Sequence, residues 1–107
     1  MQSRLGPEAA YAAGKRYQER GKYRDALEAF VQAQTQWQTT RGVDDAWTVT
    51  ALVQGAYCKL KLGDLSEGAE DLNAALRLRA ANPDAKDMPR EVDIKNQLAW
   101  VGQRLRE

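Results

Sequence analysis

Hydrophobic residues recur every three to four positions in five stretches of this chain, and polar or chain-breaking residues separate the stretches. A period near 3.6 predicts amphipathic α-helices, because one side of each helix is then apolar and must be covered by a neighbour. Glycine, proline and short polar turns mark the ends of these helices. The sequence therefore predicts an all-α fold with helices over residues 7–20, 23–40, 44–62, 65–80 and 89–106.

Single residues add detail to three of these helices. Asp44 or Asp45 is expected to cap the third helix, because a carboxylate there accepts hydrogen bonds from the first free backbone N–H groups. Trp37 and Trp47 flank the connection between the second and third helices and are expected to pack across it. The last helix is expected to bury one apolar stripe, made of Val92, Leu98, Val101 and Leu105.

The chain repeats itself when it is shifted by 42 residues, the distance from Gly21 to Gly63. Small residues then fall on small ones, and large residues on large ones. The superposed pairs are Gly14 with Ala56, Gly21 with Gly63, Ala26 with Gly68, Phe30 with Leu72 and Ala33 with Ala75. Small residues let two helices approach closely, and larger ones beside them fill the remaining space. We interpret the two stretches as the same helical hairpin, with a left-handed glycine at each turn.

This pattern resembles that of the tetratricopeptide-repeat (TPR) family, whose hairpin carries W-x2-L-G-x2-Y followed by A-x3-F. The first unit reads Ala10-x2-Ala13-Gly14-x2-Tyr17 and then Ala26-x3-Phe30. The second, more degenerate unit reads Leu52-x2-Gly55-Ala56-x2-Lys59 and then Gly68-x3-Leu72. Tyr17, Phe30 and Leu72 are expected to fill the space beside the small residues.

The resemblance implies a single TPR-like domain over residues 1–107, wound as a right-handed α-α superhelix. Repeat one would span 7–40 and repeat two 44–80. The 42-residue period exceeds the 34 residues typical of the family, so the chain resembles its long-helix variants. Leu98-x2-Val101-Gly102-x2-Leu105 begins a third copy of the first-helix pattern. We interpret the helix over 89–106 as a cap on the apolar end of the array.

Composition disfavours several classes of function. The 107 residues carry 16 Lys and Arg against 15 Asp and Glu, so the net charge is only +1, and nucleic acid is not an expected partner. Histidine is absent, which removes the usual general base and imidazole metal ligands. We expect no catalytic residue, metal or cofactor. No apolar stretch has the length of a signal-peptide core or a membrane span, so we expect no membrane partner and a cytoplasmic location.

Cys58, the single cysteine, has two interpretations. Lys59 or Lys61 could lower the pKa of its thiol and make it a nucleophile or a redox sensor. Alternatively, it packs against the preceding helix pair, since alanine usually occupies this position in the TPR pattern. We favour packing.

In proteins of the TPR family, the first helices of successive hairpins line a concave groove that binds a peptide or a helix of a partner. Carried over residue by residue, the groove residues expected here are Tyr11, Lys15, Gln18, Thr50, Val53, Gln54, Tyr57, Lys61 and Trp100. Further groove positions are Glu8 on the first helix and Asn96, Ala99 and Gln103 on the capping helix.

The family's clamp for a C-terminal carboxylate is not reproduced, because Tyr11, Gln18 and Gln54 occupy positions where lysine and asparagine are expected. The groove instead has an apolar and aromatic strip flanked by Lys15 and Lys61. Such a strip suits an amphipathic helix with acidic flanks. For Tyr11, Tyr57 and Trp100, packing in the core is the alternative.

The sequence thus predicts a non-enzymatic protein-interaction module, an adaptor-like or chaperone-like scaffold unit that binds a peptide or helix of a partner protein. The alternative is a structural self-assembly unit. In that case the first hairpin or the capping helix would pair with a second copy and form a homodimer.

Overall fold

The computed structural model describes residues 5–106 and consists of helices joined by short connections, with no strand in that range. The helices are α1 (Pro7–Glu19), α2 (Tyr23–Arg41), α3 (Ala46–Lys61), α4 (Leu65–Ala81) and α5 (Glu91–Arg106). The all-α prediction is confirmed, and the predicted helix ends lie within two residues of the observed ones. The third and fifth helices begin two residues later than predicted.

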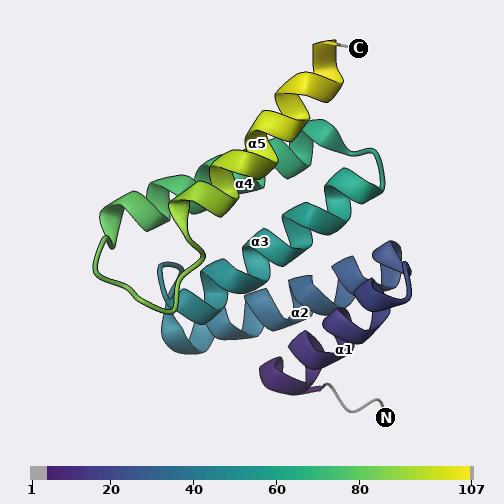
Figure 1. The fold of residues 1–107 in the computed structure, drawn as a ribbon. Coiled ribbons are helices and arrows are strands. Elements are labelled where there is room, and N and C mark those ends of the chain that lie inside the picture. Colours follow the sequence, from purple (N-terminus) through teal and green to yellow (C-terminus); the bar gives the residue numbers. More distant parts are fainter. Residues whose placement is uncertain (1–4, 107) are drawn as a thin grey trace.

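Each helix packs mainly on its neighbours in sequence, and successive helices run in opposite directions (Figure 1). Figure 1 shows α1 in front of α2 and α5 in front of α4, with α3 between the two pairs. The molecule measures 47 × 33 × 19 Å. The shortest extent is close to two helix diameters, so the chain forms an elongated slab two helices thick.

The turns of the two hairpins have the same geometry. Gly21 and Gly63 adopt φ values of +73° and +86°, which glycine accepts without the steric penalty of a Cβ atom. The N–H of Lys22 donates to the carbonyl of Tyr17 at 2.9 Å, and the N–H of Asp64 donates to that of Lys59 at 2.8 Å. The donors of the two bonds are 42 residues apart in the sequence, and so are the acceptors. The hairpin turns that the 42-residue shift predicts are therefore confirmed.

Burial follows the same shift. Apart from the exposed turn glycines Gly21 and Gly63, the superposed positions of the two hairpins are buried: Gly14 and Ala56, Ala26 and Gly68, Phe30 and Leu72, Ala33 and Ala75. Tyr17 departs from the prediction, because its side chain is 36% exposed and Phe30 alone fills the space beside Gly14. The two hairpins therefore share a packing pattern as well as a sequence pattern.

Glycine is required where the helices of each hairpin meet. A Cβ atom on Gly14 would lie 2.7 Å from the ring of Phe30, and one on Gly68 would lie 2.5 Å from Cδ2 of Leu60. Real Cβ atoms do not approach other carbons so closely. Phe30 is fully buried, so its ring has no free space into which it could retreat.

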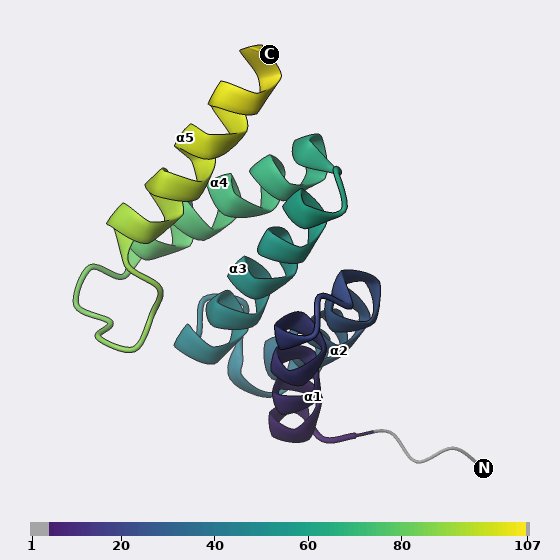
Figure 2. The same cartoon turned by 45° about the vertical axis from the view of Figure 1, so that its right-hand side comes forward.

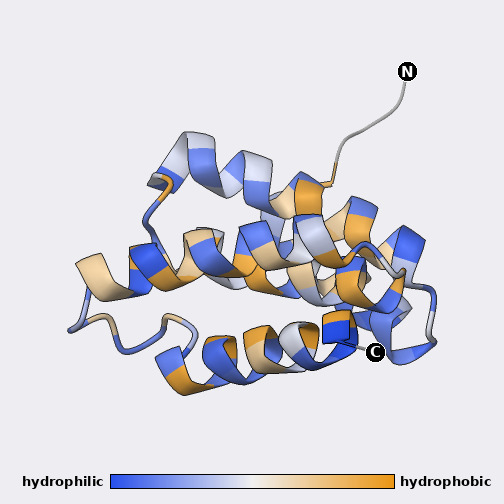
Figure 3. Cartoon of the chain, turned by 90° about the horizontal axis from the view of Figure 1, so that it is seen from above, coloured by the Kyte–Doolittle hydropathy of each residue, from blue (hydrophilic) through white to orange (hydrophobic). Residues whose placement is uncertain are grey.

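The central helix α3 is buried on two sides. Hydrophobic and hydrophilic residues are interspersed along the helices, as the amphipathic pattern requires (Figure 3). Toward α4 and α5, α3 contributes Val49, Val53, Ala56 and Leu60 to the largest hydrophobic cluster. On the other side, Ala51 packs with Ala33 and Trp37, and Cys58 packs with Ala26 and Phe30. Among the described helices, α3 is therefore the one that contributes to all three hydrophobic clusters.

Asp45, one of the two predicted candidates, caps the start of α3. The carboxylate of Asp45 accepts a hydrogen bond from the N–H of Trp47 at 2.9 Å and another from Arg41 at 2.8 Å. Burial opposes the charged form of Asp45, but these hydrogen bonds outweigh it and lower the pKa of the carboxyl group. The rings of Trp37 and Trp47 lie 5.4 Å apart, which confirms packing across this connection.

The predicted stripe of the last helix is partly wrong. Ile94 is fully buried and Val101 nearly so, whereas Val92 and Leu105 are 51% and 67% exposed. Val92 lies two residues from Ile94 and therefore on nearly the opposite side of the helix. Leu105 is exposed because the C-terminal end of α5 extends beyond α4 (Figure 2). Met88, in the connection from α4 to α5, joins the core without having been predicted there.

The contact between the helices of the first hairpin predicts that two glycine-to-alanine substitutions change the stability of the fold in opposite directions. Gly14→Ala is expected to destabilise the fold by about 1–2 kcal/mol, because overpacking against Phe30 exceeds the gain in helix propensity. Gly55→Ala is the matched control, since its new Cβ would make an ordinary contact 3.6 Å from Leu27. It should stabilise the fold by about 0.5 kcal/mol. Urea unfolding followed by circular dichroism measures both, and equal effects would contradict the close approach at Gly14.

Candidate functional site

Two adjoining hollows lie on the side of the molecule formed by α1, α3 and α5, and we call them together the groove. The α1–α3 hollow has a volume of about 260 Å³ and is lined by Gln18, Glu19, Val53, Gln54, Tyr57 and Gln97. The α3–α5 hollow, of about 290 Å³, is lined by Tyr57, Leu60, Lys61, Asn96, Gln97 and Trp100. Tyr57 and Gln97 belong to both, so the hollows form one continuous depression.

The α1–α3 hollow is polar. The side-chain amide of Gln18 donates a hydrogen bond to Oε1 of Gln54 at 2.9 Å and so ties α1 to α3. The side chain of Gln97 reaches the same hollow from α5. Its Oε1 atom is buried and has no hydrogen-bond partner among the described residues. A buried acceptor without a partner is rare in native proteins and calls for a donor.

The α3–α5 hollow is aromatic and cationic. The ring of Tyr57 packs edge-on against that of Tyr23 at 6.1 Å, and the ammonium of Lys61 lies 5.6 Å from the Tyr57 ring centre. Trp100 is 39% exposed, and the guanidinium of Arg104 lies 5.2 Å from its ring. Positive charge over aromatic faces holds these side chains in place at modest energetic gain.

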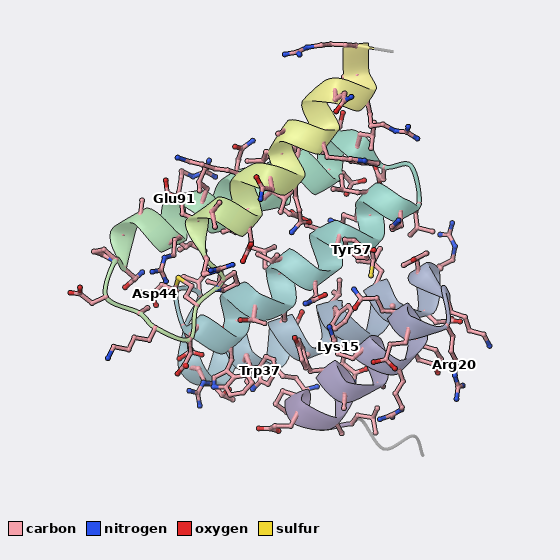
Figure 4. The ribbon with its side chains drawn as sticks, in the orientation of Figure 1. Lys15, Arg20, Trp37, Asp44, Tyr57 and Glu91 are labelled. Carbon is pink, nitrogen blue, oxygen red and sulfur yellow. The ribbon has the colours of Figure 1, made fainter. Side chains whose placement is uncertain are left out.

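The lysines beside the groove differ from their neighbour Lys59. Lys59 forms ion pairs with Asp71 at 2.7 Å and with Glu67. Within residues 5–106, neither Lys15 nor Lys61 pairs with a carboxylate. Figure 4 places Lys15 and Tyr57 on the same side of the molecule, between α1 and α3. The α3–α5 hollow therefore has one cation, Lys61, without an ion pair among the described residues, whereas the α1–α3 hollow is lined by the carboxylate of Glu19.

Six of the nine principal residues that were carried over from the TPR pattern line the groove. They are Gln18, Val53, Gln54, Tyr57, Lys61 and Trp100, and Asn96 from the further positions joins them. Val53 is only 8% exposed, so it forms part of the floor and belongs to the core cluster of α3. Its predicted role as an exposed contact is corrected accordingly.

Tyr11 belongs to the core instead of the groove surface, which corrects the expectation for this residue. Its ring packs 5.4 Å from that of Phe30 and 5.8 Å from that of Trp37. Burial raises the pKa of the Tyr11 phenol, although a hydrogen bond with Gln54 acts in the opposite direction. The side chain thus follows the alternative of core packing, because α2 covers the side of α1 on which it lies.

The remaining expected positions do not line either hollow. Thr50 uses its hydroxyl to donate a hydrogen bond to the carbonyl of Ala46 in its own helix. Lys15 lies near the groove without lining a hollow. Of the further positions, Glu8, Ala99 and Gln103 are exposed elsewhere on the surface.

Sequence reasoning missed three residues that line the groove. Gln97 lies one helical turn before Trp100, so the position of Trp100 could have identified it. Glu19 follows Gln18 at the end of α1, and Leu60 was assigned only to the core. The expected and the observed groove residues overlap only in part, because the relative tilt of α3 and α5 decides which of their side chains meet.

Cys58 is buried, and desolvation raises the pKa of its thiol to about 11. A hydrogen bond with Gln18 and the charge of Lys15 act in the opposite direction but are weaker. The thiol is therefore protonated at neutral pH, which favours the packing interpretation over a nucleophile or redox sensor.

Residues 5–106 contain no group of three or more Cys, Asp or Glu side chains placed to hold a metal ion. None of the helices in this range combines the length and the apolar character needed to cross a bilayer.

No family model matches the chain, and no curated protein or solved structure matches it either. The resemblance to the TPR family therefore stays a prediction from the residues themselves.

The environment of Cys58 predicts slow alkylation. With a thiol pKa of about 11, iodoacetamide should modify the folded protein at pH 8 at least about a hundredfold more slowly than the urea-unfolded chain, because little thiolate is present. Mass spectrometry of timed samples measures both rates. Similar rates in the two states would show that Cys58 is accessible and ionised.

Proposed function

We propose that this protein is a non-enzymatic TPR-like interaction module, a right-handed superhelix of two hairpins and a capping helix, that binds a short amphipathic helix of a partner protein. The observation that carries the proposal is the α3–α5 hollow with its exposed Trp100 beside Lys61. The repeated hairpin turns and the packing of each helix on its neighbours in sequence support the superhelical part of the proposal.

The size of the α3–α5 hollow favours a side chain over a small-molecule ligand. About 290 Å³ lies at the lower end of the range for pockets that bind cofactors or drug-sized ligands. One large apolar side chain of a partner fills such a space. Exposed Trp and Tyr residues in a concave site supply most of the binding energy in protein interfaces.

We call the partner side chain that fills the α3–α5 hollow the anchor. The charge beside the hollow determines which residues of the partner are favoured next to this anchor. Lys61 borders the hollow and has no carboxylate partner in the described part of the chain. An Asp or Glu one helical turn from the anchor of the partner would pair with Lys61, at the end of the groove away from the carboxylate of Glu19. An acidic amphipathic helix is therefore favoured over a basic one.

The α1–α3 hollow supplies polar contacts at the other end of the groove. The side chains of Glu19 and Gln97, which line this hollow, would bond to polar groups of the bound helix. Gln54 and Gln18 already bond to each other, so they are positioned for contact without a further loss of side-chain freedom.

A random-peptide display selection against the full chain tests the proposal. We expect the enriched peptides to place an aromatic or aliphatic anchor three or four residues from Asp or Glu. Trp100→Ala and Lys61→Glu should each weaken these peptides by about tenfold or more, because they remove the anchor contact and reverse the charge. Isothermal titration calorimetry with two enriched peptides measures the effect.

Lys86→Glu is the matched control for charge, because Lys86 is exposed in the connection between α4 and α5, away from the groove. Trp47→Ala is the control for an exposed tryptophan. Circular dichroism verifies that all variants keep their helicity. Enriched peptides without acidic residues, or equal binding by the groove variants and the controls, would refute the proposal.

A further inference from the structure

The two hollows of the groove are lined by opposite charges. Among the described residues, Glu19 is the charged residue that lines the α1–α3 hollow, and Lys61 is the charged residue that lines the α3–α5 hollow. Tyr57 and Gln97 line both hollows, so a bound segment that fills the whole groove meets both charges. The groove therefore has a negative end at α1 and a positive end between α3 and α5.

The two charged residues occupy the same position in successive repeats. Glu19 and Lys61 are 42 residues apart in the sequence, and each is the last residue of its helix, α1 and α3 respectively. Glycines with positive φ, Gly21 and Gly63, follow at the same distance. The free carbonyls at the C-terminal end of a helix carry the same partial negative charge in both cases. The difference in charge between the two hollows therefore comes from the two side chains.

Lys61 keeps its positive charge beside the α3–α5 hollow. Its ammonium lies 6.0 Å from the ring centre of Tyr23 and 5.6 Å from that of Tyr57. Aromatic rings hold a cation in place but have no net charge, so they do not neutralise it. The guanidinium of Arg104 lies 5.2 Å from the ring of Trp100, which adds a second cation near this end of the groove.

Glu19 is exposed and forms no ion pair within residues 5–106. Lys15 and Arg16 lie about one helical turn before it on α1, but neither pairs with it in that range, and neither lines one of the two hollows of the groove. These cations weaken the negative potential around Glu19. We therefore expect charge selection at this end of the groove to be smaller than at Lys61.

We propose that the groove selects its partner by the order of charges, with a Lys or Arg of the bound helix opposite Glu19 and an Asp or Glu opposite Lys61. This inference rests on the proposed function and adds that the partner helix carries both charges instead of acidic residues alone. A helix with acidic residues at both places would set a carboxylate against Glu19, and one with basic residues at both would set a cation against Lys61. Like charges across an interface disfavour binding and so provide specificity.

The spacing of the helices indicates how far apart the two charges of the partner lie. The hydrogen bond between Gln18 and Gln54, 2.9 Å long, shows that α1 and α3 are in direct contact. The axes of helices in contact are about 8–10 Å apart, and two turns of a bound helix span about 11 Å. A basic and an acidic residue about seven positions apart lie on one face of the bound helix and reach both hollows.

Peptide selections with charge-reversed variants test the inference. Random-peptide display is performed on the wild-type chain, on Glu19→Lys and on Lys61→Glu, and the enriched peptides are sequenced. Wild-type selections should enrich one basic and one acidic position. Glu19→Lys should replace the basic position by an acidic one and leave the other unchanged, and Lys61→Glu should do the converse. Each variant changes a single position because the two charges lie on different helices.

Calorimetry with one peptide from the wild-type selection measures the contribution of Glu19. Glu19→Lys should raise the dissociation constant by about threefold or more, the effect expected of a solvent-exposed ion pair. Exchanging the basic residue of the peptide for Glu should restore the affinity for this variant. Glu28→Lys is the matched control, because Glu28 is exposed on α2 and lines neither hollow, and it should change nothing.

Two failures of the experiment can be told apart. Enriched peptides that need Trp100 but have no basic position, or a basic position that Glu19→Lys leaves unchanged, would overturn the inference while the groove remained the binding site. Enriched peptides that bind equally well to Trp100→Ala would refute the proposed function together with the inference.

Discussion

The close contact between the two helices of each hairpin determines the rest of the structure. At Gly14 and Gly68 the backbone of one helix comes so near the facing side chain that a single methyl group would not fit. This approach lets Phe30 and Leu72 be buried completely and sets the angle at which each hairpin presents its first helix. The close-approach glycine lies on the first helix of one hairpin (Gly14) and on the second helix of the other (Gly68), and in both cases the small residue lets the two helices pack close together.

The central position of α3 lets it contribute to all three hydrophobic clusters of this small chain. It shares Ala51 and Cys58 with the first hairpin and Val53 and Leu60 with the second and with α5. Burial on two sides leaves α3 only a narrow surface for binding, formed by Gln54, Tyr57 and Lys61. The candidate site is therefore small and depends on α5 to supply its second wall.

The helix α5 serves two surfaces that differ in chemistry. Toward α3 it presents Trp100 and Gln97, which close the groove. Away from α3 it presents Gly102 and Leu105, which no helix of the described chain covers. A helix at the end of a repeat array must expose the side on which the next hairpin would pack.

The sequence by itself determined the number of helices, their turns and the repeat, because these depend on local periodicity and on glycines that need a left-handed backbone. Spacing along one helix also placed Gln54, Tyr57 and Lys61 on one face of α3, whereas only the resemblance to the TPR pattern brought Gln18 of α1 to the same surface. Only the tertiary structure decided that Tyr11 and Val53 are largely buried and that Gln97 and Leu60 line the groove. Those outcomes depend on how far neighbouring helices tilt and overlap, which periodicity within a single helix does not encode.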